Sequence, residues 1–384
     1  MSKSVEITHK ELKQFIDEVW GTKISLNLTG TVGIGKSVAV YEKAVSLAKQ
    51  EKRKFVDWNR VDKETKKEVI KNPDKYFVFM DIRLSQFDAT DLKGLPKIDS
   101  EEVVEWLIQN WLYALTKEDI KAVVFFDELN LSPPSVQASA YQIIRDRCAG
   151  DVKLGENVCV ISAGNTLEDK ANIFEMAKPL CNRFIHATLL PPVINPDSKD
   201  SWDSWAIKHN VDSRIIAYLN FEPKNLFYFD SESPEDAFPT PRSWAEYVSP
   251  LIKGKDHNNP LFQKLVASAV GRGVAVTFTE FCRLEDDIDF KEILDKPSKI
   301  QEIEQLDIRF SLVGIVDNWF DNNHKKQDCV KLLELVSYMQ PEFAILTLKM
   351  CFKKHKQTMK KNFGSIKLWT EELSKEYAKY LVSA

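Results

Sequence analysis

The chain has 384 residues, of which 43% are hydrophobic and 29% are charged, a composition that excludes a disordered or collagen-like chain. Its 53 basic and 57 acidic side chains give a formal net charge of −4, which argues against a protein whose whole surface coats nucleic acid. At roughly 150 residues per domain, two or three domains are expected.

Helix and strand patterns alternate along the first half of the chain. Apolar residues at helical spacing predict a helix over residues 12–19, and an alternating pattern predicts a strand over residues 24–28. A second helix is expected from Lys36 to about residue 52. The stretch 54–74 is charged and weakly patterned, so we interpret it as an excursion at the surface.

Continuous apolar runs predict strands that are covered on both faces. Such runs occupy residues 76–80 and 122–126, and further strands are expected over residues 158–163 and 184–190. Helical patterns lie between them at residues 134–147 and at residues 103–115, the latter with the bulky anchors Trp106, Trp111 and Tyr113. Strands that alternate with helices predict an α/β fold, an αβα sandwich with a parallel sheet.

The pattern changes after Leu190. A linker is indicated by the turn-forming residues Pro191, Pro192, Pro196 and Asp197. From Trp202 onward the periodicity is mostly helical, and the acidic run 285–289 suggests a second boundary. We therefore expect an αβα core over residues 1–195, an all-α lid over 196–288 and a helical C-terminal extension over 289–384.

The cysteines and the N-terminus bear on the compartment. Six cysteines are scattered along the chain without a CxxC pair, which excludes metal-finger and redox motifs. The first residues have no apolar signal-peptide core, and no run approaches the ~18 apolar residues that span a bilayer. We expect a cytoplasmic protein with reduced thiols and no membrane span.

A glycine-rich loop lies between the first predicted strand and the helix that follows it. It matches the pattern G-x-x-x-x-G-K-[ST] with Gly30, Thr31, Val32, Gly33, Ile34, Gly35, Lys36 and Ser37. The glycines let backbone N–H groups face phosphate oxygens, Lys36 would reach the β- and γ-phosphates, and Ser37 would ligate Mg²⁺. With Val38, these residues form the candidate ATP-binding set of a P-loop NTPase. A structural glycine turn is the alternative, and it gives Lys36 and Ser37 no role.

Two carboxylates end the strand predicted at residues 122–126. Asp127 would hold Mg²⁺, and Glu128 would orient and deprotonate the water that attacks the γ-phosphate. The alternative is that both residues only cap the next helix. This alternative is weaker because the same chain also contains the glycine-rich phosphate-loop motif. Asn165 ends the next strand, where an amide can hold the attacking water, but Gly164-Asn165 is also typical of an ordinary turn.

In chain order these motifs resemble those of AAA+ ATPases and, more closely, of the MoxR branch of that family. The segments that carry the resemblance are residues 90–96, 127–130, 163–165, 182–184 and 238–244. The resemblance covers about residues 20–285. Val32 departs from it, because MoxR-like loops usually have proline there.

The resemblance implies roles for single residues. Asn165 matches the sensor 1 residue, Arg183 the arginine finger that reaches the neighbouring subunit's nucleotide, and Arg242 the sensor 2 arginine of the lid. Each arginine would neutralise charge on the transferred phosphoryl group. The alternatives are a structural ion pair for Arg183 and a first-turn helix residue for Arg242. Arg145 and Arg147 are candidates for a second trans arginine, although a solvated face or ion pair is preferred.

The function implied by the resemblance is Mg²⁺-ATP hydrolysis that drives chaperone-like remodelling or activation of a macromolecular partner. A trans arginine implies self-association into a ring, with a hexamer as the expected size, and MoxR-like ATPases commonly act with a von Willebrand A-domain partner. The alternatives are a nucleic-acid-stimulated motor and a nucleotide-gated scaffold with little turnover. The intact Glu128 argues against the scaffold, and a metabolic P-loop kinase would leave Asn165, Arg183 and Arg242 without roles.

Partner recognition is expected in the stretch 53–75, in loops around 85–100 or in the tail. The tail has no acidic residue between Glu342 and Glu371, and its lysines are Lys349, Lys353, Lys354, Lys356, Lys360, Lys361 and Lys367. They would form a surface for nucleic acid or an acidic partner, or face water from an amphipathic helix, which we prefer. The six histidines show no metal-ligand spacing.

Overall fold

The computed structural model describes residues 4–98, 104–149, 151–166, 174–195, 198–230 and 232–381. The chain divides into two compact units, Met1–Pro191 and Pro192–Ala384. The predicted lid and extension both lie in the second unit. Of the predicted linker residues, Pro196 and Asp197 lie outside the described ranges. All six cysteines are free thiols.

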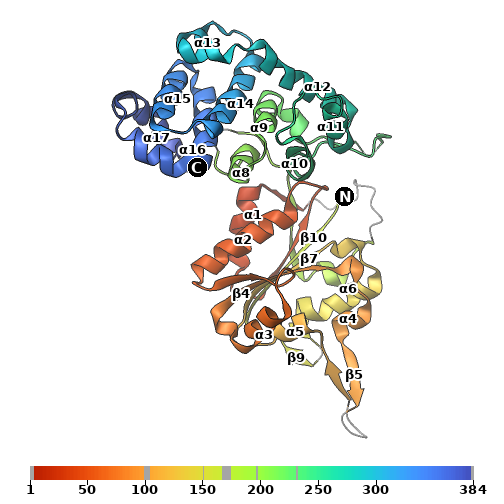
Figure 1. The fold of residues 1–384 in the computed structure, drawn as a ribbon. Coiled ribbons are helices and arrows are strands. Elements are labelled where there is room, and N and C mark those ends of the chain that lie inside the picture. The colour runs from red at the N-terminus through yellow and green to blue at the C-terminus, as the bar shows by residue number, and fades with distance from the viewer. Residues whose placement is uncertain are drawn as a thin grey trace. The chain divides into compact units, whose positions relative to one another are not determined.

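The first unit is built on a seven-stranded sheet in which neighbouring strands run parallel (Figure 1). In spatial order its strands are β1 (Val5–Ile7), β11 (Phe184–Leu189), β2 (Ser25–Thr29), β10 (Asn157–Gly164), β7 (Lys121–Asp127), β4 (Tyr76–Arg83) and β3 (Lys54–Asp57). The central strands are buried because helices cover both faces. The predicted α/β class with a parallel sheet is confirmed.

Helices form the two outer layers of this unit. α1 (His9–Val19) packs against α2 (Lys36–Gln50) on one face, and α4 (Ala89–Lys93) packs against α6 (Pro134–Tyr141) on the other (Figure 1). The other helices are α3 (Lys63–Lys71), α5 (Asn110–Leu115) and α7 (Lys178–Cys181). Sheet side chains alternate between the layers: Phe79 lies edge-on against Tyr41 of α2, whereas Phe126 lies edge-on against Trp111 of α5.

Local sequence explains where the first two helices begin. Thr8 Oγ1 accepts from Glu11 N at 3.3 Å, and the Glu11 carboxylate accepts from Thr8 N at 2.8 Å, a capping box that starts α1. Of the predicted apolar face Leu12, Phe15, Ile16 and Val19, three residues are buried and Phe15 is half-buried. α2 has no side-chain cap and begins instead at Gly35, inside the glycine-rich loop.

The stretch 54–74 is not a surface excursion, so that prediction is wrong. Its first residues form β3, which pairs with β4 at the edge of the sheet, and α3 follows. Only Val56 of the four β3 residues is buried. Short, charged edge strands are common because they discourage pairing with other chains, and they leave little hydrophobic pattern to read. β1, a strand of three residues at the other edge, was missed for the same reason.

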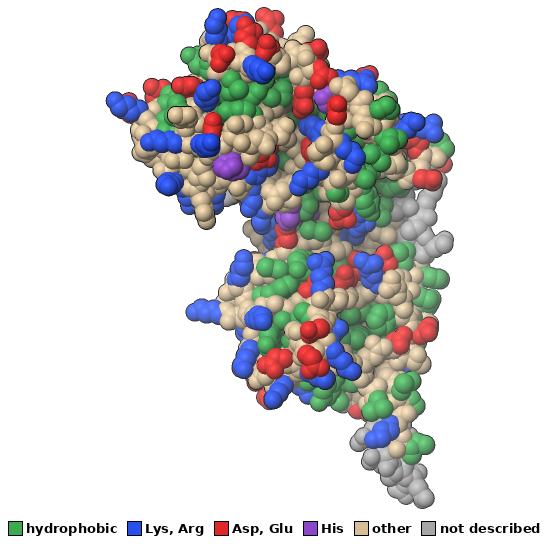
Figure 2. Space-filling view, in the orientation of Figure 1, with side chains coloured by type: hydrophobic (Ala, Val, Ile, Leu, Met, Phe, Trp, Pro, Cys, Tyr) green, Lys and Arg blue, Asp and Glu red, His purple; other side chains and the backbone are tan. Residues whose placement is uncertain are grey.

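The segment 103–115 is not one helix, which corrects a second prediction. Residue 103 lies outside the described ranges, Val104–Leu107 forms β6, and only α5 is helical. β6 pairs antiparallel with β5 (Leu95–Ile98), and Trp106 is 42% exposed. Hydrophobic side chains are visible on this projecting hairpin in Figure 2. A smaller antiparallel hairpin joins β8 (Cys148–Ala149) to β9 (Val152–Lys153).

The second unit is helical, and no strand occurs among its described residues (Figure 1). Its α-helices are α8 (Trp202–Lys208), α9 (Ser213–Phe221), α10 (Ser249–Ile252), α11 (Phe262–Val270), α12 (Arg272–Arg283), α13 (Phe290–Asp295), α14 (Leu306–Asn322), α15 (Lys326–Tyr338), α16 (Pro341–Phe363) and α17 (Ser374–Leu381). Short 3₁₀ and π turns are η6 (Pro223–Leu226), η7 (Ser243–Val248), η8 (Leu284–Asp287), η9 (Pro297–Glu302) and η10 (Leu368–Leu373). One hydrophobic cluster runs from Trp202 to Leu381, so the acidic run 285–289 does not separate two cores.

The lysine-rich tail is only partly a water-facing surface. Lys349 is buried, and Lys354 pairs with Asp317 at 2.7 Å and with Asp321 at 2.6 Å. Asp317 is buried, and loss of hydration of its charged form raises its pKa to about 6. Within the described ranges, no helix has the length and apolar character that crossing a membrane requires.

Candidate active site

The glycine-rich loop joins the carboxyl end of β2 to the amino end of α2. Gly33 has φ 75° and Gly35 has φ 92°, left-handed conformations that favour glycine. A Cβ on Gly30 would lie 2.9 Å from the Leu189 carbonyl oxygen. Among the described residues, the N–H groups of Gly33 and Gly35 have no acceptor, and Thr31 Oγ1 is buried without a partner. Unsatisfied donors around such a loop fit a phosphate group.

Lys36 is buried, and its ammonium group lies against the loop. Nζ donates to the carbonyl oxygen of Gly30 at 2.6 Å, to that of Thr31 at 2.9 Å and to Asn165 Oδ1 at 3.4 Å. The lysine of the loop and the asparagine at the end of β10 therefore meet at the carboxyl edge of the sheet, although they are 129 residues apart in the chain.

Ser37 and Asp127 form the second contact at this edge. Ser37 Oγ, in the first turn of α2, donates to Asp127 Oδ2 at 2.9 Å. Asp127 is the last residue of β7, which lies between β10 and β4. A hydroxyl and a carboxylate oxygen are the hard ligands that Mg²⁺ prefers, so the donor set fits this ion.

Glu128 leaves β7 in a left-handed backbone conformation, φ 56° and ψ 34°. That conformation costs a residue with a side chain on the order of 1–2 kcal/mol. The Glu128 N–H donates to Asp127 Oδ1 at 3.0 Å, and Ser85 Oγ donates to Glu128 Oε2 at 2.7 Å. Within the described part of the chain, Oε1 has no partner. Ser85 thus holds one carboxylate oxygen, and no described residue bonds to the other.

Asn130 is the last residue of the motif 127–130, and the motif predicts no role for it. Its side-chain amide donates to the Asn165 carbonyl oxygen at 2.8 Å, and its Oδ1 accepts from Asn165 N at 3.1 Å. A Cβ on Gly164 would lie 2.6 Å from Asn130 Oδ1. The glycine therefore permits a close approach through which Asn130 positions Asn165.

Asp81 is a third carboxylate near this edge, and sequence reasoning missed it. It lies on β4 opposite Phe125, and its neighbour Arg83 lies opposite Asp127. Burial, followed by repulsion from Asp127, raises the pKa of Asp81 to about 6, and its Oδ1 is buried without a hydrogen bond. An acid directly after the apolar run 76–80 was the available signal, the same one that pointed to Asp127.

His9 contacts the glycine-rich loop, although the spacing of the histidines predicts no site. Its Nε2 lies 2.9 Å from the Ile34 carbonyl oxygen, and burial lowers the pKa of the imidazole. A neutral ring donates to this carbonyl through Nε2. The contact connects the first residue of α1 to the loop. The spacing of the histidines in the sequence does not predict it, because Ile34 is 25 residues away.

Arg183 lies at the opposite end of its strand from the glycine-rich loop. Phe184 pairs with Ser25, whereas Thr188 pairs with Thr29, the residue before the loop. Four residues of strand correspond to about 13 Å. Arg183 is therefore not brought together with Lys36.

Arg183 and Arg145 share one aromatic partner. Arg183 Nε donates to the Tyr141 hydroxyl at 3.1 Å, and Arg145 reaches the same oxygen at 3.4 Å. The bond from Arg183 lowers the pKa of Tyr141. Arg147 differs from both, because burial lowers its pKa and its guanidinium donates to the Val158 carbonyl oxygen. Arg147 thus contacts the backbone of β10 in its own chain.

Arg242 belongs to the second unit, whereas the loop residues belong to the first. It precedes η7, is half-exposed and lies 4.0 Å from Glu246. Thr240 and Ser243 bond to each other around it: Thr240 N donates to Ser243 Oγ at 2.7 Å, and Ser243 N donates to Thr240 Oγ1 at 3.0 Å.

Comparisons with known proteins find distant structural neighbours. No protein-family model and no curated protein matches the sequence. Three similar structures are NtrX from Brucella abortus (12% identity, TM-score 0.30), PCH-2 from C. elegans (13%, 0.29) and Orc1 from Aeropyrum pernix in complex with DNA (11%, 0.33). The alignments cover 75%, 71% and 91% of this chain. This chain spans 53% of the NtrX chain, 66% of the PCH-2 chain and 82% of the Orc1 chain.

Proposed function

We propose that this protein is a Mg²⁺-dependent ATPase of the AAA+ type. The observation that carries the proposal is the pair of contacts Lys36–Asn165 and Ser37–Asp127 at the carboxyl edge of a parallel sheet. Ligands of open α/β sheets bind outside this edge. The fold and the glycine loop position those four side chains together.

The loop and Lys36 bind the phosphates in this proposal. The N–H groups of Gly33 and Gly35 donate to phosphate oxygens, as expected of donors that find no acceptor in the described parts of the protein. Lys36 exchanges the neutral carbonyl oxygens of Gly30 and Thr31 for anionic oxygens, which are stronger acceptors of its hydrogen bonds. Val32, Ile34 and Val38 complete the proposed nucleotide-binding set.

Ser37 and Asp127 would hold Mg²⁺, which supplies charge neutralisation at the phosphates when bound. Glu128 acts as the general base: Ser85 holds Oε2, and Oε1 accepts the proton of the attacking water. Asn165, positioned by Asn130, orients that water or contacts the γ-phosphate.

Arg183 acts on the nucleotide of a neighbouring subunit in a ring, for which six subunits are the expected number. The distance between Arg183 and the loop of the same chain supports this trans role, because a guanidinium at the other end of β11 lies too far from a nucleotide bound at that loop to contact it. Arg242 acts as the sensor 2 arginine of a lid over residues 196–288, with 289–384 as an extension.

The biological role that the MoxR resemblance suggests is remodelling or activation of a partner, including a von Willebrand A-domain protein, in the cytoplasm. A nucleic-acid-stimulated motor is less favoured, because two lysines of the tail are buried or paired within the unit. The scaffold alternative is also less favoured, because Glu128 retains an accepting oxygen.

The proposal is tested by phosphate release from ATP with the purified full chain, with Mg²⁺ and with Mg²⁺ chelated. Turnover that requires both Mg²⁺ and Lys36 supports it. Turnover that persists in Lys36→Ala, or ATP binding without hydrolysis by the parent protein, contradicts it. Partners are then captured with Glu128→Gln in ATP, using Lys36→Ala as the matched control that cannot hold nucleotide.

A further inference from the structure

Tyr141, the last residue of α6, contacts two arginines that come from different parts of the chain. Arg145 belongs to the π turn η4 (Gln142–Asp146), whereas Arg183 directly precedes β11. Both donate to the tyrosine hydroxyl, Arg183 through Nε at 3.1 Å and Arg145 through Nη1 at 3.4 Å. Their guanidinium carbons lie over the ring, 5.8 Å and 5.7 Å from its centroid. One neutral side chain therefore holds two positive groups.

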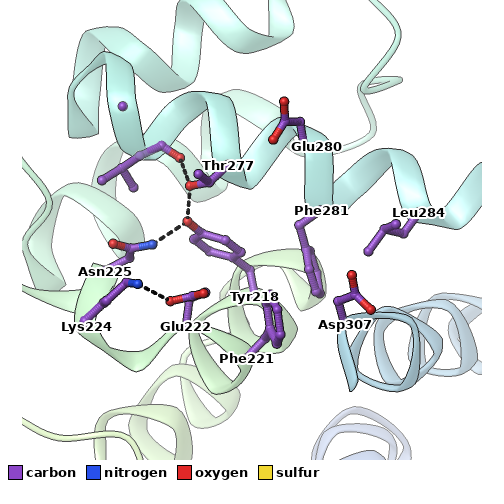
Figure 3. A pocket seen from close by; sticks show the side chains of 12 residues that line it. Tyr218, Phe221, Glu222, Lys224, Asn225, Thr277, Glu280, Phe281, Leu284 and Asp307 are labelled. Atoms are coloured by element: carbon purple, nitrogen blue, oxygen red, sulfur yellow. Dashed lines mark hydrogen bonds and ion pairs between the residues drawn. The ribbon is translucent and has the colours of Figure 1, made fainter. Parts of the chain in front are cut away.

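A tyrosine hydroxyl in the second unit has a different environment. The Tyr218 hydroxyl accepts from the Asn225 amide at 2.6 Å and shares a 2.6 Å hydrogen bond with the Thr277 hydroxyl (Figure 3). Two neutral partners are thus enough to satisfy a tyrosine hydroxyl in this protein. Satisfying the Tyr141 hydroxyl does not explain why two arginines meet there.

The positive charge of this cluster is only partly compensated. Arg145 lies 3.4 Å from Asp146, but about half of each side chain is exposed, and surface pairs of this kind contribute little. Among the described residues, Arg183 has no ion-pair partner, and its two terminal nitrogens have no acceptor. Within the described part of the chain, the cluster thus keeps a net positive charge and N–H groups that can bind an anion.

The backbone that carries both arginines is fixed. Ile143 and Ile144 of η4 are buried, which anchors the turn, while about half of the Arg145 side chain is exposed. Arg183 directly precedes β11, whose backbone is paired with β2. Tyr141 restricts the two side chains as well. A side chain that is already held loses less conformational entropy when it binds a ligand.

Both arginines lie away from the glycine-rich loop of their own chain. Arg183 stands at the end of β11 that is opposite this loop. Arg145 bonds to the same hydroxyl as Arg183, so it lies at that end too. A phosphate group that this pair binds therefore comes from another molecule.

We propose that Tyr141 is a positioning residue that presents Arg145 and Arg183 together to the phosphates of a nucleotide held by a second copy of this chain. The inference rests on the proposed function, to which it adds Arg145 as a second phosphate-contacting residue and Tyr141 as the group that holds both. Two adjacent guanidiniums suit a polyphosphate, because each can donate two N–H bonds to anionic oxygens. A neutral hydroxyl aligns them without cancelling their charge, as a carboxylate would.

The first test measures kcat and KM for ATP with the full chain. Arg145→Ala should lower kcat at least about tenfold with little change in KM, because a trans arginine acts mainly in the transition state. Tyr141→Phe keeps the ring and removes the acceptor, so kcat should fall by about three- to tenfold, the worth of one hydrogen bond. KM and the unfolding midpoint should stay at the parent's values, whereas a merely structural role would lower the midpoint.

The matched control is Arg60→Ala, which should keep the parent's kcat. Arg60 also lies over a tyrosine ring, that of Tyr41 at 5.8 Å, and 3.2 Å from the carboxylate of Asp57. It follows β3, which is at the far edge of the sheet from β1 and β11. The control removes an arginine of similar surroundings from a different place.

Mixed variants show whether the two arginines act as a pair. Arg145→Ala mixed with Lys36→Ala should recover part of the activity, because some interfaces combine an intact loop with both arginines of the neighbour. Arg145→Ala mixed with Arg183→Ala should recover none, since every subunit then lacks one member of the pair. If Arg145 acted on the nucleotide of its own chain, this second mixture would regain activity.

Failure of this inference differs from failure of the proposed function. A parent protein without Lys36-dependent turnover overturns both. When the parent turns over ATP, the inference alone is overturned if Arg145→Ala keeps the parent's kcat, if Arg60→Ala loses as much, or if Tyr141→Phe lowers only the unfolding midpoint. It is also overturned if the mixture of Arg145→Ala with Arg183→Ala regains activity, or if the chain does not self-associate in ATP.

Discussion

Ser37 Oγ donates a 2.9 Å hydrogen bond to Asp127 Oδ2, which ties the first turn of α2 to the end of β7 across 90 residues of sequence. The Lys36–Asn165 contact does the same between α2 and β10. Because β2, β10 and β7 are adjacent in the sheet, these two bonds bring the ends of three strands to one place.

Replacing Lys36 with alanine should weaken ATP binding about 10- to 100-fold, since a hydrogen bond to a charged group is worth about 1.5–3 kcal/mol. Calorimetry with ATP measures the affinity. Lys49→Ala is the matched control, because Lys49 is an exposed lysine in the last turn of the same helix. Equal affinity in Lys36→Ala and the parent protein would remove Lys36 from the phosphate site.

Glu128→Gln should retain ATP binding and slow the chemical step by roughly 10²–10⁴, because the amide keeps the shape but cannot accept a proton. Single-turnover hydrolysis measures this step. Ser85→Ala should have a smaller effect, since it removes only the bond that holds Oε2. Near-normal turnover in Glu128→Gln would mean that the base lies elsewhere.

Arg183→Ala should bind ATP almost normally and hydrolyse it slowly, because the guanidinium acts mainly in the transition state. Mixed with Lys36→Ala, it should recover part of the activity, since some interfaces then combine an intact loop with an intact Arg183. The parent's specific activity should also rise with protein concentration. A mixture that forms mixed oligomers and stays inactive, together with activity independent of concentration, would refute the trans role.

Asn130→Ala should destabilise the protein by about 1–2 kcal/mol, because it removes two hydrogen bonds to the part-buried backbone of Asn165. It should also slow hydrolysis more than it weakens ATP binding, because Asn165 loses its support. Urea unfolding and turnover measure the two effects. No measurable loss of stability in Asn130→Ala would argue against this arrangement.

The pH dependence of stability should change in Asp81→Asn. Burial raises the pKa of Asp81 to about 6 in the folded protein, against about 3.9 in the unfolded chain. The folded state therefore binds more protons between these values, and this group lowers stability as pH rises from about 4 to 6. Because the side chain is only partly buried, solvent screening reduces the effect.

We expect Asp81→Asn to be more stable than the parent at pH 8 by on the order of 1 kcal/mol and to lose that advantage near pH 4. Thermal unfolding across this pH range checks it. An advantage for Asp81→Asn that is constant with pH would show that titration of this carboxyl is not its cause.

Several features of this protein follow from the sequence alone, because their determinants are local. The central strands reveal themselves by continuous apolar runs, since a strand covered on both faces needs no polar alternation. The loop Gly30–Ser37 and the acids Asp127 and Glu128 are short motifs whose flanking strands identify the carboxyl edge of a parallel sheet. The class of fold and the candidate nucleotide loop were therefore predictable.

Other features were decided only by tertiary structure. β3 and β6 are short and pair at an edge or in a hairpin, so pairing rather than pattern makes them strands. Asp81 acquires its raised pKa from burial and from Asp127 on the adjacent strand, and Asn130 acquires its role from the approach of Gly164. The sequence pattern predicts that Lys354 faces water, but in the folded protein it pairs with Asp317 and Asp321 of α14. In each case the deciding partner is distant in sequence. The local sequence of one strand or helix does not specify which distant element will pack against it.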